Sequence, residues 1–249
     1  MYAIVTGMNG TVAPELARAL EANGYVVVPW VRAEVPIDDP AAVREFIGNV
    51  KPDWFCHVAL GSPDWAEWAA AACDEFDIGF LFTGSVSVYS SSQVGPFSIH
   101  DVPEPNDDYG RYKLECERRV RLANPDARIA RLGWQIGEAP GNNNLVDYLH
   151  RHHVDHGHID ASRNWIPSCA MLADTAASLV GIIEMQSAGL YHLEGNPGLS
   201  FLEIAESLNR LRGNPWTIVP TDTPVMNNLM RDDRVEVRPI IETLAPSET

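Results

Sequence analysis

The chain has 249 residues, 45% of them hydrophobic, and is long enough to bury one large core, or a nucleotide-binding core with a small additional lobe. Its 34 acidic and 18 basic residues give a formal net charge of −16, which disfavours nucleic acid as a partner, although a local cluster of donors can still bind a small anion. The four cysteines are widely spaced, so neither a disulfide framework nor a structural zinc site is expected.

Short apolar runs alternate with helical patterns along the first half of the chain. Residues 2–6 predict a strand, a turn follows at 7–10, and Leu16 and Leu20 share one face of a predicted helix. Further strands are expected at 25–31, 54–60, 78–83 and 127–132. Helices are expected between them at about 40–50, 64–76 and 109–124. This alternation predicts a Rossmann-type, doubly wound α/β fold with a parallel sheet.

Beyond Gly133 the alternation weakens. Helices are expected at 142–153, 170–185 and 201–211, the last with Ser200 as N-cap and Glu203 in the capping-box position, and a strand at 189–193. The remaining C-terminal residues, rich in proline and charge, predict little regular structure. We therefore expect a dinucleotide-binding domain over residues 1–133, with 169–193 packing back on it. A small substrate-binding lobe would comprise 134–168 and 194–249.

The turn after the first strand is a candidate coenzyme site. In the run from Thr6 to Ala13, glycines let the backbone turn sharply and approach a pyrophosphate, and the following helix N-terminus offers N–H donors. The predicted contacts are Gly7, Asn9, Gly10, Thr11 and Val12. An ordinary turn between a strand and a helix is the alternative.

The end of the second strand sets the expected coenzyme preference. The sequence there is Pro29-Trp30-Val31-Arg32, with no acidic residue for the ribose 2′-hydroxyl of NAD. Arg32 suits a 2′-phosphate, so NADP(H) is favoured and NAD(H) is the alternative coenzyme. A solvated surface arginine is the other interpretation of Arg32.

Tyr109 and Lys113 lie four residues apart at the start of a predicted helix and therefore face the same side. A nearby ammonium is expected to lower the phenol pKa from about 10, making Tyr109 a better proton donor to a carbonyl that receives hydride. Lys113 can also hold the nicotinamide ribose. Ser85, at the end of the fourth strand, can donate a hydrogen bond to the same carbonyl. Ser87 is the local alternative, and would face the other way if the strand continues that far.

Together these residues resemble the extended short-chain dehydrogenases/reductases, within the NAD-dependent epimerase/dehydratase superfamily, and most closely the dTDP-4-dehydrorhamnose reductase branch. The matching elements are Thr6-Gly7-x-x-Gly10-x-x-Ala13, Lys51-Pro52-Asp53, Ser85 with Val88-Tyr89, the run from Asp108 to Leu114 with Glu117, and Arg131-Leu132 to Gly137. Weaker matches continue to about residue 212. The resemblance implies Ser85, Tyr109 and Lys113 as the catalytic triad, and Ala59 and Leu60 as further coenzyme contacts.

The sequence also departs from that family. The run from His57 to Gly61 replaces the usual Asn-Ala-Ala type segment, and the chain is shorter than typical members. Val86-Ser87 stands where nucleotide-sugar dehydratases carry an acid pair, which counts against dehydration. We expect an NAD(P)H-dependent carbonyl reductase or alcohol dehydrogenase acting on a small, nucleotide-sugar-like ketone. A catalytically silent NAD(P)-binding regulatory subunit and a sugar-nucleotide epimerase are the alternatives.

Several further residues are weighed as ligand contacts. His152 and His156 have the spacing of a metal pair, but without a Glu-x-x-His frame or a cysteine partner we expect no metal. Trp134, Asn143 and Trp165 are candidate substrate contacts, with Ser87. The expected partner is a small ketone or alcohol, with a homodimer as an open alternative. Without a signal peptide or a long apolar run, the protein is expected to be cytoplasmic and free of membrane contacts.

Overall fold

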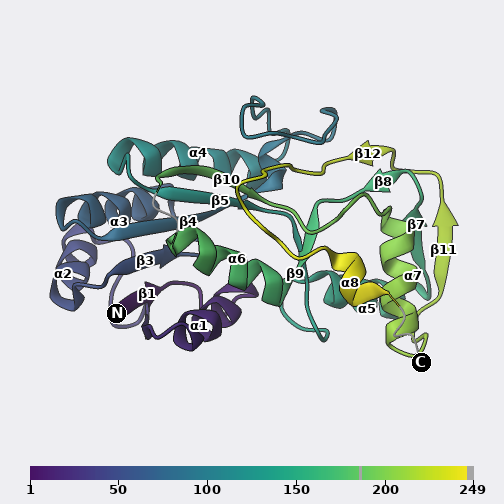
Figure 1. The fold of residues 1–249 in the computed structure, drawn as a ribbon, viewed down its shortest axis with the longest axis horizontal. Helices are drawn as coiled ribbons and strands as arrows, with labels where there is room; N and C mark the ends of the chain where they lie inside the picture. The colour runs from purple at the N-terminus through teal and green to yellow at the C-terminus, as the bar shows by residue number, and fades with distance from the viewer. Residues whose placement is uncertain (185–186, 246–249) are drawn as a thin grey trace. The chain divides into compact units, whose positions relative to one another are not determined.

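The computed structural model describes residues 1–184 and 187–245, and these cluster into two compact units (Figure 1). The first unit comprises residues 1–90, 103–131 and 176–191. The second comprises 91–102, 132–175 and 192–249, the last described as far as 245. The C-terminal end of the helix expected at 170–185 falls outside the described residues.

The first unit is built on a sheet of six strands among the described residues, in the order β10-β5-β4-β3-β1-β2. The strands are β1 (Tyr2–Val5), β2 (Val26–Pro29), β3 (Trp54–His57), β4 (Gly79–Ser85), β5 (Arg128–Leu132) and β10 (Gly189–Leu193). β1 pairs in parallel with β2 and with β3, and β3 pairs in parallel with β4. The expected Rossmann-type parallel sheet is confirmed.

Helices cover both faces of this sheet (Figure 1). They are α1 (Val12–Ala22), α2 (Pro40–Val50), α3 (Pro63–Glu75), α4 (Asp108–Ala123) and α6 (Leu172–Glu184). The core on the face of α2, α3 and α4 includes Phe55, Phe80 and Phe82 from the strands. The alanine-rich face of α3 buries Ala66, Ala69 and Ala70, and such small side chains let a helix lie close to its neighbours.

Strand β3 ends at His57, three residues before its expected end at residue 60. The Thr6 hydroxyl accepts hydrogen bonds from the backbone N–H groups of Val58 and Ala59, each at 3.0 Å. These two N–H groups are thereby satisfied outside a strand ladder. The segment after β3 is therefore a fixed loop rather than a continued strand.

The second unit combines helices with short strand pairs. Its helices are α5 (Leu145–His156), α7 (Phe201–Leu211) and α8 (Ile240–Leu244). The parallel pairs are β6 (Trp134–Ile136) with β9 (Cys169–Met171), β7 (Ile159–Ser162) with β11 (Ile218–Thr221), and β8 (Trp165–Ile166) with β12 (Met226–Asn227). The capping box of Ser200 and Glu203 at the start of α7 is confirmed.

Most of the described C-terminal segment has no regular structure, as expected, but three short elements, β11, β12 and α8, lie there. These elements are short, and the two strands take their register from β7 and β8 rather than from a local pattern. Residues 91–102, which the sequence placed with the first domain, cluster with the second unit. The N–H groups of Gly95 and Phe97 donate to the carbonyls of Asn227 and Leu229, each at 2.7 Å.

All four cysteines are free and buried. In the described ranges, no helix combines the length and the apolar character needed to cross a membrane.

His57, at the end of β3, is buried among aromatic rings. Its imidazole stacks with Phe82 at 5.7 Å between ring centroids and meets Trp65 edge-on at 4.5 Å. Its Nδ1 has no hydrogen-bond partner among the residues that the structure describes. Burial, together with the positive charges of Lys113 and Arg32, lowers the pKa of His57 to about 3. The folded protein therefore holds this imidazole in its neutral form.

This burial predicts a loss of stability in mild acid. An unfolded histidine titrates at about 6.5, so below that pH the unfolded state gains a proton that the folded state rejects. Relative to a His57→Leu variant, the wild-type free energy of unfolding should fall by about 2 kcal/mol between pH 6.5 and pH 5. Urea unfolding at each pH measures the difference. If the free energy of unfolding fell equally with pH in the two proteins, the acid sensitivity could not be assigned to His57.

Candidate active site

The glycine turn joins β1 to α1 with backbone groups close together. Gly7 has a positive φ of 87°, and a Cβ there would lie 3.0 Å from the Ala59 backbone, so only glycine fits without strain. The Gly10 N–H donates to the Gly7 carbonyl at 2.7 Å. Asn9 and Gly10 are exposed, while Thr11 and Val12 are half-buried. At Gly7 and Gly10 the turn thus presents backbone rather than a side chain.

The start of α1 suits a bound phosphate. The side chain of its N-cap residue, Thr11, makes no capping hydrogen bond to the helix. Other helix starts are capped by side chains, as in α2, α3, α4, α5 and α7, with Asp39, Ser62, Asp107, Asn144 and Ser200. A helix N-terminus without a side-chain cap can direct its N–H donors and positive dipole end to an anion. A dinucleotide pyrophosphate fits this donor set.

The loop after β3 is held at several points beside this turn. Ala59 is buried against Gly7, and the Leu60 side chain is exposed. The Arg32 guanidinium donates a hydrogen bond to the Leu60 carbonyl, and the Gly61 N–H donates to the Tyr112 hydroxyl at 3.2 Å. Gly7, Arg32, Ala59 and Leu60 are predicted coenzyme contacts that lie far apart in sequence. The structure brings them into one region of the first unit.

Ser85 and Tyr109 come together from β4 and α4. β4 ends at Ser85, and Asp107 caps α4 by accepting a hydrogen bond from the Gly110 N–H at 2.7 Å, which places Tyr109 in the first turn. The Ser85 side chain interacts with the Tyr109 hydroxyl, although the Tyr109 residue as a whole is 46% exposed. The phenol oxygen is thus directed to Ser85 while part of the ring faces solvent.

The expected lowering of the Tyr109 pKa is wrong. Burial of the hydroxyl raises the pKa of Tyr109 above its usual value, and the Ser85 hydrogen bond offsets this only in part. The Lys113 ammonium lies 6.0 Å from the centroid of the Tyr109 ring and donates to the Thr83 carbonyl at 2.9 Å. Burial of this ammonium lowers the pKa of Lys113 to about 8. Tyr109 therefore remains a protonated phenol at neutral pH.

Ser87 does not extend the strand. Residues Val86–Val88 form a 3₁₀ turn, and the Ser87 N–H donates to the Ser85 hydroxyl oxygen at 3.1 Å. The Ser87 carbonyl lies directly against Gly110, where any Cβ would overlap it. The backbone of Ser87 therefore orients Ser85 and contacts the first turn of α4.

The candidate substrate residues Trp134 and Trp165 are close together in the second unit. Their ring centroids lie 6.0 Å apart, and Phe201 packs 4.8 Å from Trp165. The Trp165 indole N–H donates to the Asn228 side-chain oxygen at 3.1 Å. Asn143 is exposed just before α5, whose N-cap is the buried Asn144. Trp134 and Trp165 thus form a partly exposed aromatic cluster, and Asn143 lies in the loop that precedes α5.

The histidines of α5 form ring contacts. The centroids of His152 and His156 lie 4.5 Å apart, and His152 stacks on Tyr148 at 5.4 Å. Within the described ranges, no group of three or more histidine, cysteine, aspartate or glutamate side chains is arranged to hold a metal ion.

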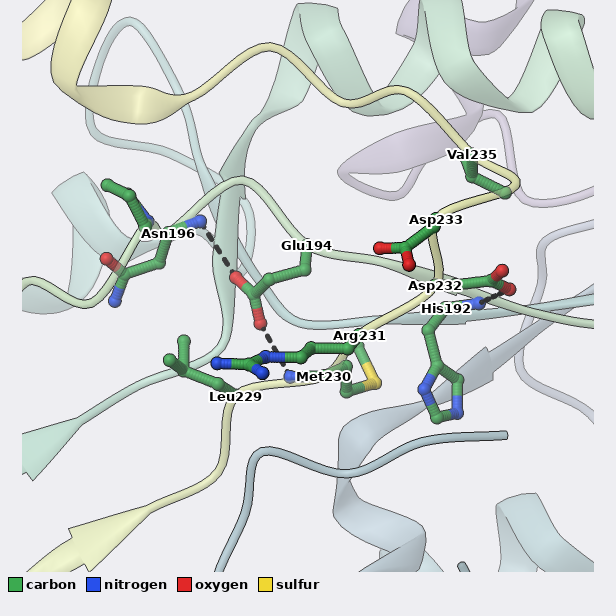
Figure 2. A pocket seen from close by; sticks show the side chains of 10 residues that line it. His192, Glu194, Asn196, Leu229, Met230, Arg231, Asp232, Asp233 and Val235 are labelled. Carbon is green, nitrogen blue, oxygen red and sulfur yellow. Dashed lines mark hydrogen bonds between the residues drawn. The ribbon is translucent and has the colours of Figure 1, made fainter. Parts of the chain in front are cut away.

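A cavity of about 280 Å³ lies in the second unit between the segment at 192–197 and the segment at 229–235 (Figure 2). Figure 2 shows the Glu194 carboxylate accepting hydrogen bonds from the N–H groups of Asn196 and Met230, at 2.8 and 2.9 Å. The Asp232 carboxylate accepts one from the His192 N–H at 3.2 Å. These acids tie the C-terminal segment to the chain after β10, and Ser85, Tyr109 and Lys113 are not among the residues that line this cavity.

Sequence reasoning missed several residues that hold the site. Thr6 and Tyr112 bind the loop after β3, the Thr83 carbonyl accepts from Lys113, and Trp65 lies beneath Arg32. A hydroxyl residue just before the first glycine was the available signal for Thr6. Trp65 carried no local signal, because its contact with Arg32 joins residues that are distant in sequence.

Comparisons with known proteins identify the family of the chain. The model of the RmlD substrate binding domain family matches residues 1–68 and 64–228. A probable low-salt glycan biosynthesis reductase of Haloferax volcanii is 24% identical over 96% of this chain and 88% of its own. The dTDP-4-dehydrorhamnose reductase of Streptomyces griseus is 27% identical over 88% of this chain and 79% of its own.

Solved structures share the fold. That of dTDP-4-dehydrorhamnose reductase from Bacillus anthracis in complex with NADP has a TM-score of 0.85 at 19% identity, covering 98% of this chain and 96% of that one. The orthologous reductase from Clostridium acetobutylicum has a TM-score of 0.81 at 21% identity, covering 93% and 90%.

Proposed function

Because the chain belongs to the RmlD substrate binding domain family, we propose that it is an NADP(H)-dependent reductase of the keto group of a sugar nucleotide. It is an NAD(P)-dependent oxidoreductase of the short-chain dehydrogenase/reductase type. The observation that carries the proposal is the interaction of Ser85 with the Tyr109 hydroxyl, with Lys113 buried beside the Tyr109 ring. This group lies in the same unit as the glycine turn.

The chemistry follows from the positions of these side chains. When bound, NADPH supplies the hydride that reaches the carbonyl carbon. Tyr109 holds its proton at neutral pH and donates it to the carbonyl oxygen as negative charge develops there. Ser85 donates a hydrogen bond to the same oxygen and keeps it beside the phenol. The Lys113 ammonium stabilises the phenolate that remains and can bind the nicotinamide ribose.

The coenzyme would lie along the glycine turn and the loop after β3. The N–H groups at the start of α1 would bind the pyrophosphate, with Gly7 and Gly10 allowing its close approach. Ala59 and Leu60 would contact the nucleotide from the neighbouring strand end. Arg32 would bind the 2′-phosphate, which favours NADP(H) over NAD(H).

The names of the relatives support a sugar-nucleotide substrate, since several are dTDP-4-dehydrorhamnose reductases. The partly exposed aromatic pair of Trp134 and Trp165 offers the ring faces on which a sugar or a base can stack. These two residues, with Asn143, are the proposed substrate contacts in the second unit.

A turnover assay tests the proposal. The purified protein should oxidise NADPH in the presence of dTDP-4-dehydrorhamnose and reduce its keto group to a hydroxyl, whereas a simple ketone without a nucleotide should react far more slowly. Coenzyme oxidation followed by absorbance and product identified by mass spectrometry give the result. Coenzyme binding without turnover across a panel of keto sugars would contradict the proposal and support the silent subunit. Interconversion of sugars without net coenzyme consumption would support an epimerase.

A further inference from the structure

The Arg32 side chain is ordered although it lies on the surface. Its guanidinium donates a hydrogen bond to the Leu60 carbonyl oxygen, and its central carbon lies 5.3 Å from the centroid of the Trp65 ring. A long exposed arginine ordinarily samples many rotamers, and ordering it on a ligand costs conformational entropy. Here the guanidinium is held in place by the protein itself.

The Trp65 ring beneath Arg32 is itself packed in the core. Trp65 is fully buried, and its ring meets those of Trp30 and His57 at centroid distances of 5.5 and 4.5 Å. The backbone N–H of Trp65 donates to the Ser62 hydroxyl at the start of α3. A Cβ at Gly61 would overlap the indole, so the glycine lets the loop pass directly over the ring. Trp65 is therefore a rigid platform for the guanidinium.

The second support of Arg32, the Leu60 carbonyl, is fixed as well. The N–H groups of Val58 and Ala59 donate to the Thr6 hydroxyl, and that of Gly61 donates to Tyr112. In the described part of the chain, the bond to Leu60 is the one hydrogen bond of Arg32. Because a guanidinium carries five N–H donors, several remain for a bidentate contact with an anion.

We propose that Trp65 is a positioning residue for coenzyme choice, which holds Arg32 in the orientation that binds the 2′-phosphate of NADP(H). The cation–π contact and the bond to Leu60 place the flat guanidinium in advance, so little ordering is needed when the phosphate arrives. NADH lacks the 2′-phosphate, so the fixed orientation of Arg32 does not increase its binding affinity. The inference rests on the proposed function, because it requires a dinucleotide at the glycine turn.

Dissociation constants for NADPH and NADH test the inference, measured by fluorescence titration of the full chain. Trp65→Leu should weaken NADPH binding about tenfold and leave NADH binding nearly unchanged, since only the 2′-phosphate contact depends on the ring. Trp65→Phe retains an aromatic face and should keep most of the preference. Trp68→Leu is the matched control, because Trp68 is a partly buried tryptophan on the same helix that packs against the same core. It should leave the ratio of the two constants unchanged.

The outcomes separate this inference from the proposed function. Equal weakening of NADPH and NADH by Trp65→Leu and Trp65→Phe would show a purely structural role for Trp65 and overturn the inference. Arg32→Ala should remove the preference for NADPH. If Arg32→Ala removes it and both Trp65 variants keep it, the inference about Trp65 fails, and the assignment of Arg32 to the 2′-phosphate stands. If Arg32→Ala leaves the ratio unchanged, the assignment of the 2′-phosphate to Arg32 fails too. Thermal unfolding confirms that each variant is folded. If Trp65→Leu is not, Trp65→Met, which also removes the aromatic face, provides the test and should lower the preference for NADPH.

Discussion

Replacing Tyr109 with phenylalanine should lower turnover by about 10²- to 10⁴-fold, the contribution typical of a general acid, while coenzyme affinity changes by no more than about threefold. The substitution removes the hydroxyl that interacts with Ser85 and retains the partly exposed ring. Steady-state kinetics with the keto sugar nucleotide and a separate coenzyme titration measure the two quantities. The loss is expected in kcat because the proton is donated only as the carbonyl accepts hydride.

Tyr112→Phe is the matched control for this prediction. It removes a phenol hydroxyl three residues further along α4, whose oxygen accepts a hydrogen bond from the Gly61 N–H and has no proposed role toward the substrate carbonyl. This variant should weaken coenzyme binding and leave most of kcat intact. A Tyr109→Phe enzyme as fast as the wild type would disprove the role of Tyr109 as proton donor.

The second large effect concerns a buried ion pair beneath α4. Arg131 of β5 and Glu117 of α4 form a salt bridge at 2.7 Å, with both side chains almost fully buried. Arg131 also donates to the Tyr89 hydroxyl at 2.8 Å. Glu117 lies one helical turn beyond Lys113, so the pair fastens the helix that carries the candidate catalytic residues to the sheet.

Glu117→Leu should destabilise the protein by about 3–5 kcal/mol, because it leaves the Arg131 charge buried without its partner. The double variant Glu117→Leu with Arg131→Met should recover much of this loss, since it removes both buried charges. Urea unfolding of the wild type, both single variants and the double variant forms the thermodynamic cycle. Additive losses in the double variant would contradict a direct interaction between the two charges.

The sequence predicts the first unit well because its elements are encoded locally. Alternating apolar runs and helix starts such as Asp39-Pro40 predict the order of the strands and helices. They also predict the ends of most of these elements to within a few residues. The contact between Ser85 and Tyr109 also follows, because a parallel strand and the next helix meet at the carboxyl edge of the sheet. The strands β6 to β9 could not be found in this way, since they have two to four residues and take their register from partners distant in sequence.

The supports of the candidate site were not predictable for the same reason. The hydroxyl of Thr6 and the phenol of Tyr112 bind loop residues more than 50 positions away. The direction of the Tyr109 pKa shift depends on how deeply the hydroxyl is buried, and a spacing of four residues to Lys113 does not contain that information. Such quantities belong to the packed protein rather than to any segment of it.

Gly110 determines how closely the proposed proton donor, Tyr109, approaches the end of β4. Its bare Cα rests on the Ser87 carbonyl, so the helix that carries Tyr109 can approach the end of β4 as closely as two backbones permit. Even a methyl group at residue 110 would lift the helix start away and lengthen the gap that the phenol must span. The lack of a side chain at Gly110 therefore controls how close the Tyr109 hydroxyl lies to the end of β4.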